Sequence, residues 1–155
     1  MIRTSEEQCA LLKKRLRFFH FLDEDDLAAV ADYFSCRQFR AGETLWQEGD
    51  DGDYEAFIVE GRVEVKKETE FPGKQVVVGV YSAGTIVGEL CVVDQRPRAV
   101  TAVALEDTAI LTLSCSQLEK LLEQNPAVGI RLLKGILLAV STRLRKSFER
   151  LAAIF

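Results

Sequence analysis

One short segment of the chain combines an acid, an arginine and two backbone-restricting residues at a spacing suited to an anionic sugar. Gly88-Glu89-Leu90 follows a predicted strand, and Pro97 fixes the backbone immediately before Arg98. A planar guanidinium binds two phosphate oxygens at once, whereas a carboxylate accepts hydrogen bonds from hydroxyl groups. These residue types therefore favour binding of a small sugar phosphate, with Glu89 on the hydroxyls and Arg98 on the phosphate.

The backbone between the two charged residues adds neutral donors. Gly88 lacks a Cβ atom, so a ligand can approach the main chain closely there. Leu90 to Val93 are predicted to form one helical turn, whose free N-terminal amides can face an anion. The alternative reading of the same residues is a structural ion pair between Glu89 and Arg98 that closes a loop.

This segment resembles the phosphate-binding cassette of the cyclic-nucleotide-binding family, which includes the catabolite activator protein and the regulatory subunits of protein kinase A. The family's cassette reads Gly-Glu-Leu-Ala-Leu, a short variable stretch, and then Pro-Arg-Ala-Ala-Thr. This chain has Gly-Glu-Leu-Cys-Val at 88–92 and Pro-Arg-Ala-Val-Thr at 97–101. The similarity also includes residues 41–43, 48–50 and 58–65, and it extends roughly from Phe18 to Arg150.

The resemblance implies a role for each cassette residue. Glu89 would accept a hydrogen bond from the ribose 2′-hydroxyl, and Arg98 would pair with the cyclic phosphate, assisted by backbone amides. Family members often carry Ser or Thr after the arginine to assist guanine recognition, so Ala99 favours cyclic AMP, with cyclic GMP as the alternative. The implied ligand-binding residues of the cassette are Gly88, Glu89, Leu90, Cys91, Pro97, Arg98, Ala99 and Val100.

The last helix departs from the family pattern where the base is recognised. In the activator protein a Thr-Ser pair on this helix contacts adenine, and the matching positions here are Arg143 and Leu144. Base recognition is therefore expected to differ. We add Arg143 to the ligand-binding residues because a guanidinium can stack on a purine face. A solvent-exposed arginine without a ligand role is the alternative.

The elements that must position these residues follow a helix–strand–helix order. Helical periodicity occupies residues 4–34, glycine-punctuated short strands fill 35–114, and helices return over 116–152. We expect one domain over 1–155: mainly β, an antiparallel β-roll of the jelly-roll-like barrel type, with N-terminal helices and a long C-terminal helix. The predicted strands are 44–47, 55–60, 62–67, 76–81, 99–104 and 109–113.

Capping residues mark the predicted helix starts. Ser, Thr, Asp and Asn favour the N-cap because their side chains accept hydrogen bonds from free amides of the first turn. Proline favours the first helical position, where its missing N–H costs no intrahelical bond. The predicted N-caps are Thr4, Asp23, Ser116 and Asn125, with Pro126 at the start of the last helix.

Composition places the chain among ordinary globular proteins. Its 155 residues carry a net charge of −4, which argues against a general nucleic-acid binder, since such proteins present basic surfaces. We see no signal peptide, and no apolar run approaches the ~20 residues that cross a bilayer. A cytoplasmic protein without membrane or direct nucleic-acid contact is therefore expected. The four cysteines lack metal-ligand spacing, so we expect reduced thiols, no metal and no cofactor.

The last helix has apolar residues on two sides, which suggests two partners. Leu132, Ile136 and Ala139 are expected to cover the roll. A second stripe with steps of three and four has the spacing of a coiled-coil seam, and we expect a homodimer through it. The alternative is one broad stripe that packs on its own domain. The seam consists of Ile130, Leu133, Leu137, Val140, Leu144, Ser147, Leu151 and Ile154.

The function that we expect is a non-catalytic regulatory sensor, which relays ligand binding through its C-terminal helix to an unidentified effector protein. No set of nucleophile, base and orienting residue indicates an enzyme. One alternative is a fragment of a ligand-responsive transcription regulator, because many relatives append a helix-turn-helix after this helix and the chain stops at Phe155. A second is a degenerate domain that serves only protein–protein interaction.

Overall fold

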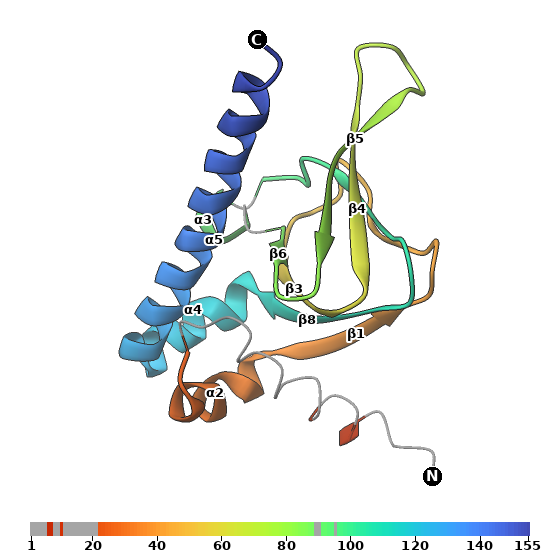
Figure 1. The fold of residues 1–155 in the computed structure, drawn as a ribbon. Helices are drawn as coiled ribbons and strands as arrows, with labels where there is room; N and C mark the ends of the chain where they lie inside the picture. Colours follow the sequence, from red (N-terminus) through yellow and green to blue (C-terminus); the bar gives the residue numbers. More distant parts are fainter. Residues whose placement is uncertain (1–5, 8–9, 11–21, 89–90, 95) are drawn as a thin grey trace.

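The computed structural model describes residues 6–7, 10, 22–88, 91–94 and 96–155, and it has the predicted fold class (Figure 1). Antiparallel strands form the centre, short helices flank one side, and a long helix ends the chain. The elements in order are α2 (Glu24–Val30), η2 (Ala31–Tyr33), β1 (Ser35–Phe39), β2 (Thr44–Trp46), β3 (Tyr54–Glu60), β4 (Arg62–Glu68), β5 (Gln75–Ser82), β6 (Ile86–Val87), α3 (Cys91–Asp94), β7 (Thr101–Ala104), β8 (Thr108–Ser114), α4 (Cys115–Gln124) and α5 (Pro126–Ala152).

The strands form two four-stranded antiparallel sheets that make a roll and not a closed barrel. One sheet has the order β1-β8-β3-β6, and the other has the order β2-β7-β4-β5. In the second sheet β4 alternates, with Val63 and Val65 buried and Glu64 between them less so, because only one face meets the core. In the first sheet the central strands β3 and β8 are buried on both faces, which explains their nearly continuous apolar sequences, whereas the edge strand β1 is mostly exposed.

Two apolar cores result from this arrangement. Phe57 and Val59 of β3 face the helices, while Ala56 and Ile58 of the same strand face the interior of the roll. The helical core includes Leu121 of α4 together with buried residues of α2 and α5 and with Phe34, which follows η2. Alternate residues of one strand therefore join the roll to the helices that surround it.

Local capping signals determine two of the helix starts as predicted. Asp23 forms a capping box with Asp26, whose amide donates to Asp23 Oδ1 at 2.8 Å. Asn125 caps α5, and Pro126 occupies its first turn. Both predictions are confirmed. The predicted cap at Thr4 lies outside the described residues.

The predicted cap at Ser116 is wrong by two residues. The helix α4 begins after Ser114, whose hydroxyl oxygen accepts a hydrogen bond from the Gln117 amide at 3.1 Å. The amide of Cys115 meanwhile donates to the carbonyl oxygen of Asp53 at 2.9 Å, so the helix starts directly where β8 ends. The tertiary contact with the β2–β3 connection thus selects between two serines of equal capping ability.

The expected reduced state of the cysteines is wrong for Cys36, which is disulfide-bonded. Sequence spacing does not show which cysteines approach each other in space, and this limits the prediction. Cys115 is a free thiol. Cys9 and the side chain of Cys91 lie outside the described residues.

Among the described residues, no helix has the length and apolar character of a membrane-spanning segment.

An ion pair between buried Asp26 and half-exposed Arg131 joins α2 to α5. Asp26 is 3% exposed, and Arg131 Nε donates to its Oδ2 at 2.8 Å while Nη2 donates to Oδ1. The hydrogen bond from Arg131 lowers the pKa of the Asp26 carboxyl, and burial opposes this shift. The pair fixes the first third of α5 against the N-terminal helical unit.

Replacing Arg131 with methionine is expected to lower Tm at neutral pH, because Asp26 would keep a buried charge without its partner. The lowered pKa in the folded state means that the stabilisation is present above the ordinary carboxyl pKa and is lost as pH falls through the folded value. The Tm difference between wild type and variant should therefore shrink in acid, as calorimetric scans between pH 7 and pH 3 would measure. Asp26→Asn is the control that removes this pH dependence; an undiminished difference at low pH would contradict the assignment.

Candidate ligand-binding site

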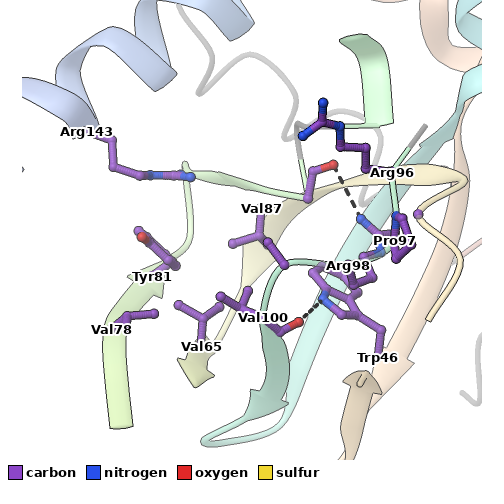
Figure 2. A pocket seen from close by; sticks show the side chains of 13 residues that line it. Trp46, Val65, Val78, Tyr81, Val87, Arg96, Pro97, Arg98, Val100 and Arg143 are labelled. Carbon is purple, nitrogen blue, oxygen red and sulfur yellow. Dashed lines mark hydrogen bonds between the residues drawn. The ribbon is translucent and has the colours of Figure 1, made fainter. Parts of the chain in front are cut away.

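A cavity of about 190 Å³ opens between one end of the roll and α5 (Figure 2). Its walls are mainly apolar, with three arginine side chains, Arg96, Arg98 and Arg143, in different parts of the wall. The lining residues come from β2, β4, β5, β6, α5, the 96–100 segment and the connections that hold Gly52 and Gly88. They are Trp46, Gly52, Val65, Val78, Tyr81, Val87, Gly88, Arg96, Pro97, Arg98, Ala99, Val100 and Arg143.

Arg98 is a buried cation in the wall of this cavity. Its side chain is 6% exposed, and Nη2 donates to the carbonyl oxygen of Tyr54 at 2.6 Å while Nη1 reaches that of Gly88 at 3.4 Å. Nε has no hydrogen-bond partner in the described part of the chain. No carboxylate forms an ion pair with Arg98 among the described residues. Within the described part of the chain, the guanidinium is therefore contacted only by neutral groups.

The backbone of Arg98 is held by the turn after β2. Its amide donates to the carbonyl oxygen of Asp50 at 2.7 Å, and its carbonyl oxygen accepts from the Gly49 amide at 2.9 Å. Gly52 packs so closely against this segment that an added Cβ would lie 2.7 Å from the Arg96 carbonyl oxygen. The backbone of the turn 49–52 and the backbone of residues 96–98 therefore hold each other in place.

A second contact holds the cassette after Arg98. Lys67 of β4 donates to the carbonyl oxygen of Ala99 at 3.0 Å and pairs with Glu48. The bond from Lys67, followed by that from the Glu68 amide, lowers the pKa of the Glu48 carboxyl. The amide of Glu48 donates to Thr101 Oγ1 at 2.9 Å. The segment from Arg98 to Thr101 is therefore tied to β4 and to the β2 turn on both sides of Ala99.

Gly88 has a backbone conformation in which a larger residue would be strained. Its φ is +79°, a left-handed value that favours glycine. An added Cβ would also collide with Nη1 of Arg98. Glycine at this position therefore makes room for the arginine side chain itself, in addition to any role in ligand approach.

Arg143 extends from α5 above Tyr81, where it lines the cavity (Figure 2). Its guanidinium carbon lies 4.3 Å from the centroid of the Tyr81 ring, and Nη2 donates to the carbonyl oxygen of Ile86. The side chain is partly buried and in contact with β5 and β6, and its role toward a ligand stays a prediction. These contacts join the second half of α5 to the roll at the cavity.

The structure brings together six of the nine residues assigned from sequence: Gly88, Pro97, Arg98, Ala99, Val100 and Arg143 line the cavity. Glu89 and Leu90 lie outside the described residues, and Cys91 is described only as the first residue of α3. The predicted helical turn is present over Cys91–Asp94. Sequence reasoning missed the lining residues of other strands, Trp46, Val65, Val78, Tyr81 and Val87, together with Arg96 and with Gly52 of the β2–β3 connection.

The chain matches a family model described as the cyclic nucleotide-binding domain, over residues 36–125. It is 31% identical over 138 residues to the cAMP-dependent protein kinase regulatory subunit of Mycosarcoma maydis, covering 84% of this chain and 26% of that protein. It is 27% identical over 111 residues to the Cyclic AMP receptor protein of Thermus thermophilus, covering 72% of this chain and 51% of that protein. The chain thus spans less than two thirds of these relatives.

A solved structure shares nearly the whole fold. The crystal structure of a cyclic nucleotide-binding domain from Methylobacillus flagellatus superposes with a TM-score of 0.86 at 25% sequence identity. The match covers 95% of this chain and 85% of that one. The similarity therefore includes the helices on either side of the roll as well as the strands.

Proposed function

Because the chain belongs to the cyclic nucleotide-binding domain family, we propose that it binds a cyclic mononucleotide as a non-catalytic sensor, with cyclic AMP favoured over cyclic GMP. The observation that carries the proposal is Arg98. A buried guanidinium without a carboxylate partner among the described residues is costly unless an anion compensates it. The phosphate of a cyclic nucleotide supplies one negative charge, and the Arg98 side chain lines the cavity that would receive it.

The proposed roles of the remaining residues follow from their positions. Backbone groups around Ala99 assist Arg98 at the phosphate, and Glu89 binds the ribose 2′-hydroxyl as the family resemblance implies. Val65, Val78 and Val87 give the cavity an apolar wall for the purine. Arg143 and Tyr81 are placed to contact the base, because a purine face can stack on a guanidinium as the tyrosine ring does.

We assign the relay of binding to α5. This helix carries Arg143, so a ligand that contacts Arg143 changes the bonds between α5 and the roll. The relevant partner would be a second copy of the chain, or an effector protein, that reads the position of α5. The exposed stripe on this helix supports the homodimer, since Ile130, Leu137 and Leu144 are each at least 50% exposed at intervals of seven residues.

Thermal-shift measurements test the proposal directly. Cyclic AMP at 100 times its Kd is expected to stabilise the chain by about 2.7 kcal/mol, which corresponds to a rise in Tm of roughly 5–10 °C for a domain of this size. Cyclic GMP should give a smaller shift, and 5′-AMP, which lacks the ring-closed phosphate, serves as the control. An unchanged Tm with each cyclic nucleotide would refute the proposed function.

A further inference from the structure

The Arg98 guanidinium contacts two aromatic rings that the sequence did not assign to the site. Its Cζ atom lies 4.1 Å from the centroid of the Trp46 ring and 4.6 Å from that of the Tyr54 ring. The two rings themselves pack edge to face, with centroids 5.8 Å apart and planes at 83°. The cation therefore lies against both members of one aromatic pair, and Figure 2 shows Trp46 beside it.

Each ring is itself fixed by a hydrogen bond to its polar atom. Trp46 is 5% exposed, and its Nε1 donates to the carbonyl oxygen of Val100 at 3.0 Å. The hydroxyl oxygen of Tyr54 accepts from Arg37 Nη1 at 3.0 Å, and burial raises the pKa of this hydroxyl. The ring pair is therefore a fixed surface to which the arginine side chain conforms.

We propose that Trp46 and Tyr54 are positioning residues that hold Arg98 ready for the phosphate before the ligand binds. This inference rests on the proposed function and describes how that site is prepared. Aromatic faces and carbonyl oxygens attract the guanidinium without neutralising it. A carboxylate in their place would form an ion pair that the ligand would have to break, whereas the rings keep the full positive charge for the ligand.

The expected effect follows from the ordering of one side chain. The rings contact the cation in this structure, and we infer that they keep this contact when the ligand binds, so that their contribution to affinity is preorganisation. Immobilising one flexible side chain costs about 0.5–1.5 kcal/mol on binding, which is about two- to tenfold in Kd for each ring removed.

Matched substitutions separate the contribution of each aromatic ring from that of its hydrogen-bonding polar atom. Trp46→Phe and Trp46→Leu both remove the hydrogen bond to Val100, but only the leucine variant removes the ring. Tyr54→Phe and Tyr54→Leu make the same comparison for the hydroxyl bonded to Arg37. Calorimetry with cyclic AMP should give near wild-type Kd for the phenylalanine variants and a Kd about two- to tenfold higher for each leucine variant. Because Tyr54 is only partly buried, its pair also serves if Trp46→Leu does not fold.

A second readout requires no ligand. The Nε–H NMR signal of Arg98 is assigned by its loss in Arg98→Lys. In wild type and in both phenylalanine variants, the ring currents of the aromatic residues at positions 46 and 54 should shift this signal from its position in a free arginine. In the leucine variants it should move toward the position of a free arginine. A change confined to global stability would leave this signal in place in the folded fraction.

The outcomes distinguish this inference from the proposed function. If wild type binds no cyclic nucleotide, the proposed function fails, and the Nε–H signal alone decides whether the rings position Arg98. If wild type binds cyclic AMP but leucine and phenylalanine variants share one Kd and one Arg98 signal, the positioning role is overturned while the sensor function stands.

Discussion

Arg98→Ala is expected to weaken cyclic AMP binding by about 2–5 kcal/mol, since the phosphate would enter the cavity without its only assigned cationic partner. The reason lies in the burial of Arg98, because water cannot replace a guanidinium that is 6% exposed as it can replace a surface charge. Titration calorimetry on wild type and variant measures the difference. Retention of wild-type affinity by the alanine variant would remove the basis of the proposed function.

Arg98→Lys serves as the control for geometry. A lysine keeps the charge, but its ammonium cannot donate simultaneously to the Tyr54 carbonyl oxygen and to two phosphate oxygens in the plane of a fork. We expect its affinity to fall between those of the alanine variant and wild type. The unliganded alanine variant should remain folded, because the substitution removes a buried charge that has no carboxylate partner within the described chain.

Leu137→Glu with Leu144→Glu is expected to convert a homodimer to monomers. Leu137 and Leu144 are 67% and 53% exposed on α5, one coiled-coil repeat apart, and Leu151 continues the stripe at 57%. Placing carboxylates in a two-fold apolar seam costs at least about 2 kcal/mol, or more than about twentyfold in the dimer Kd. Sedimentation velocity over a concentration series measures the change.

Thr142→Glu is the matched control for this helix, because Thr142 is exposed on α5 but lies outside the stripe. It should leave the dimer intact. A wild-type chain that sediments as a monomer throughout the series would show that the stripe has another role. The structure already refines the predicted seam: Leu133 and Val140 pack partly on the chain's own core, whereas Phe148, 60% exposed, adds to the outer stripe.

The parts of the fold that sequence predicted are those with local causes. Glycines with positive φ at positions 42, 49, 61, 73 and 84 punctuate the strands, and the caps at Asp23 and Asn125 mark helix starts without help from distant residues. β1 and β6 were not among the predicted strands for different reasons. β1 reads Ser-Cys-Arg-Gln-Phe and is stabilised by pairing with β8, while β6 has only two residues.

The candidate site was predictable only where its residues are contiguous. Gly88, Pro97 and Arg98 were recognisable because the cassette residues are local and their chemistry is distinctive. Trp46 joins them through the register of β2 on β7, which places its ring against an arginine 52 positions later in the chain. No local pattern encodes such a pairing, since tertiary contact decides which apolar residue meets the cation.

The unequal burial of α5 has a mechanical consequence. Its buried residues, Val128, Gly129, Leu132, Gly135 and Ile136, all lie in the first half, so the helix is anchored most firmly up to Ile136. Beyond Ile136 it contacts the roll through partly buried side chains, chiefly Val140 and Arg143. At a rise of about 1.5 Å per residue, Arg143 is about 10 Å from that anchor and Ala152 is about 24 Å from it. A rigid tilt about Ile136 that moves Arg143 by about 1 Å would displace the helix end by about 2.3 Å. The helix therefore has the proportions of a lever whose short arm ends at the cavity.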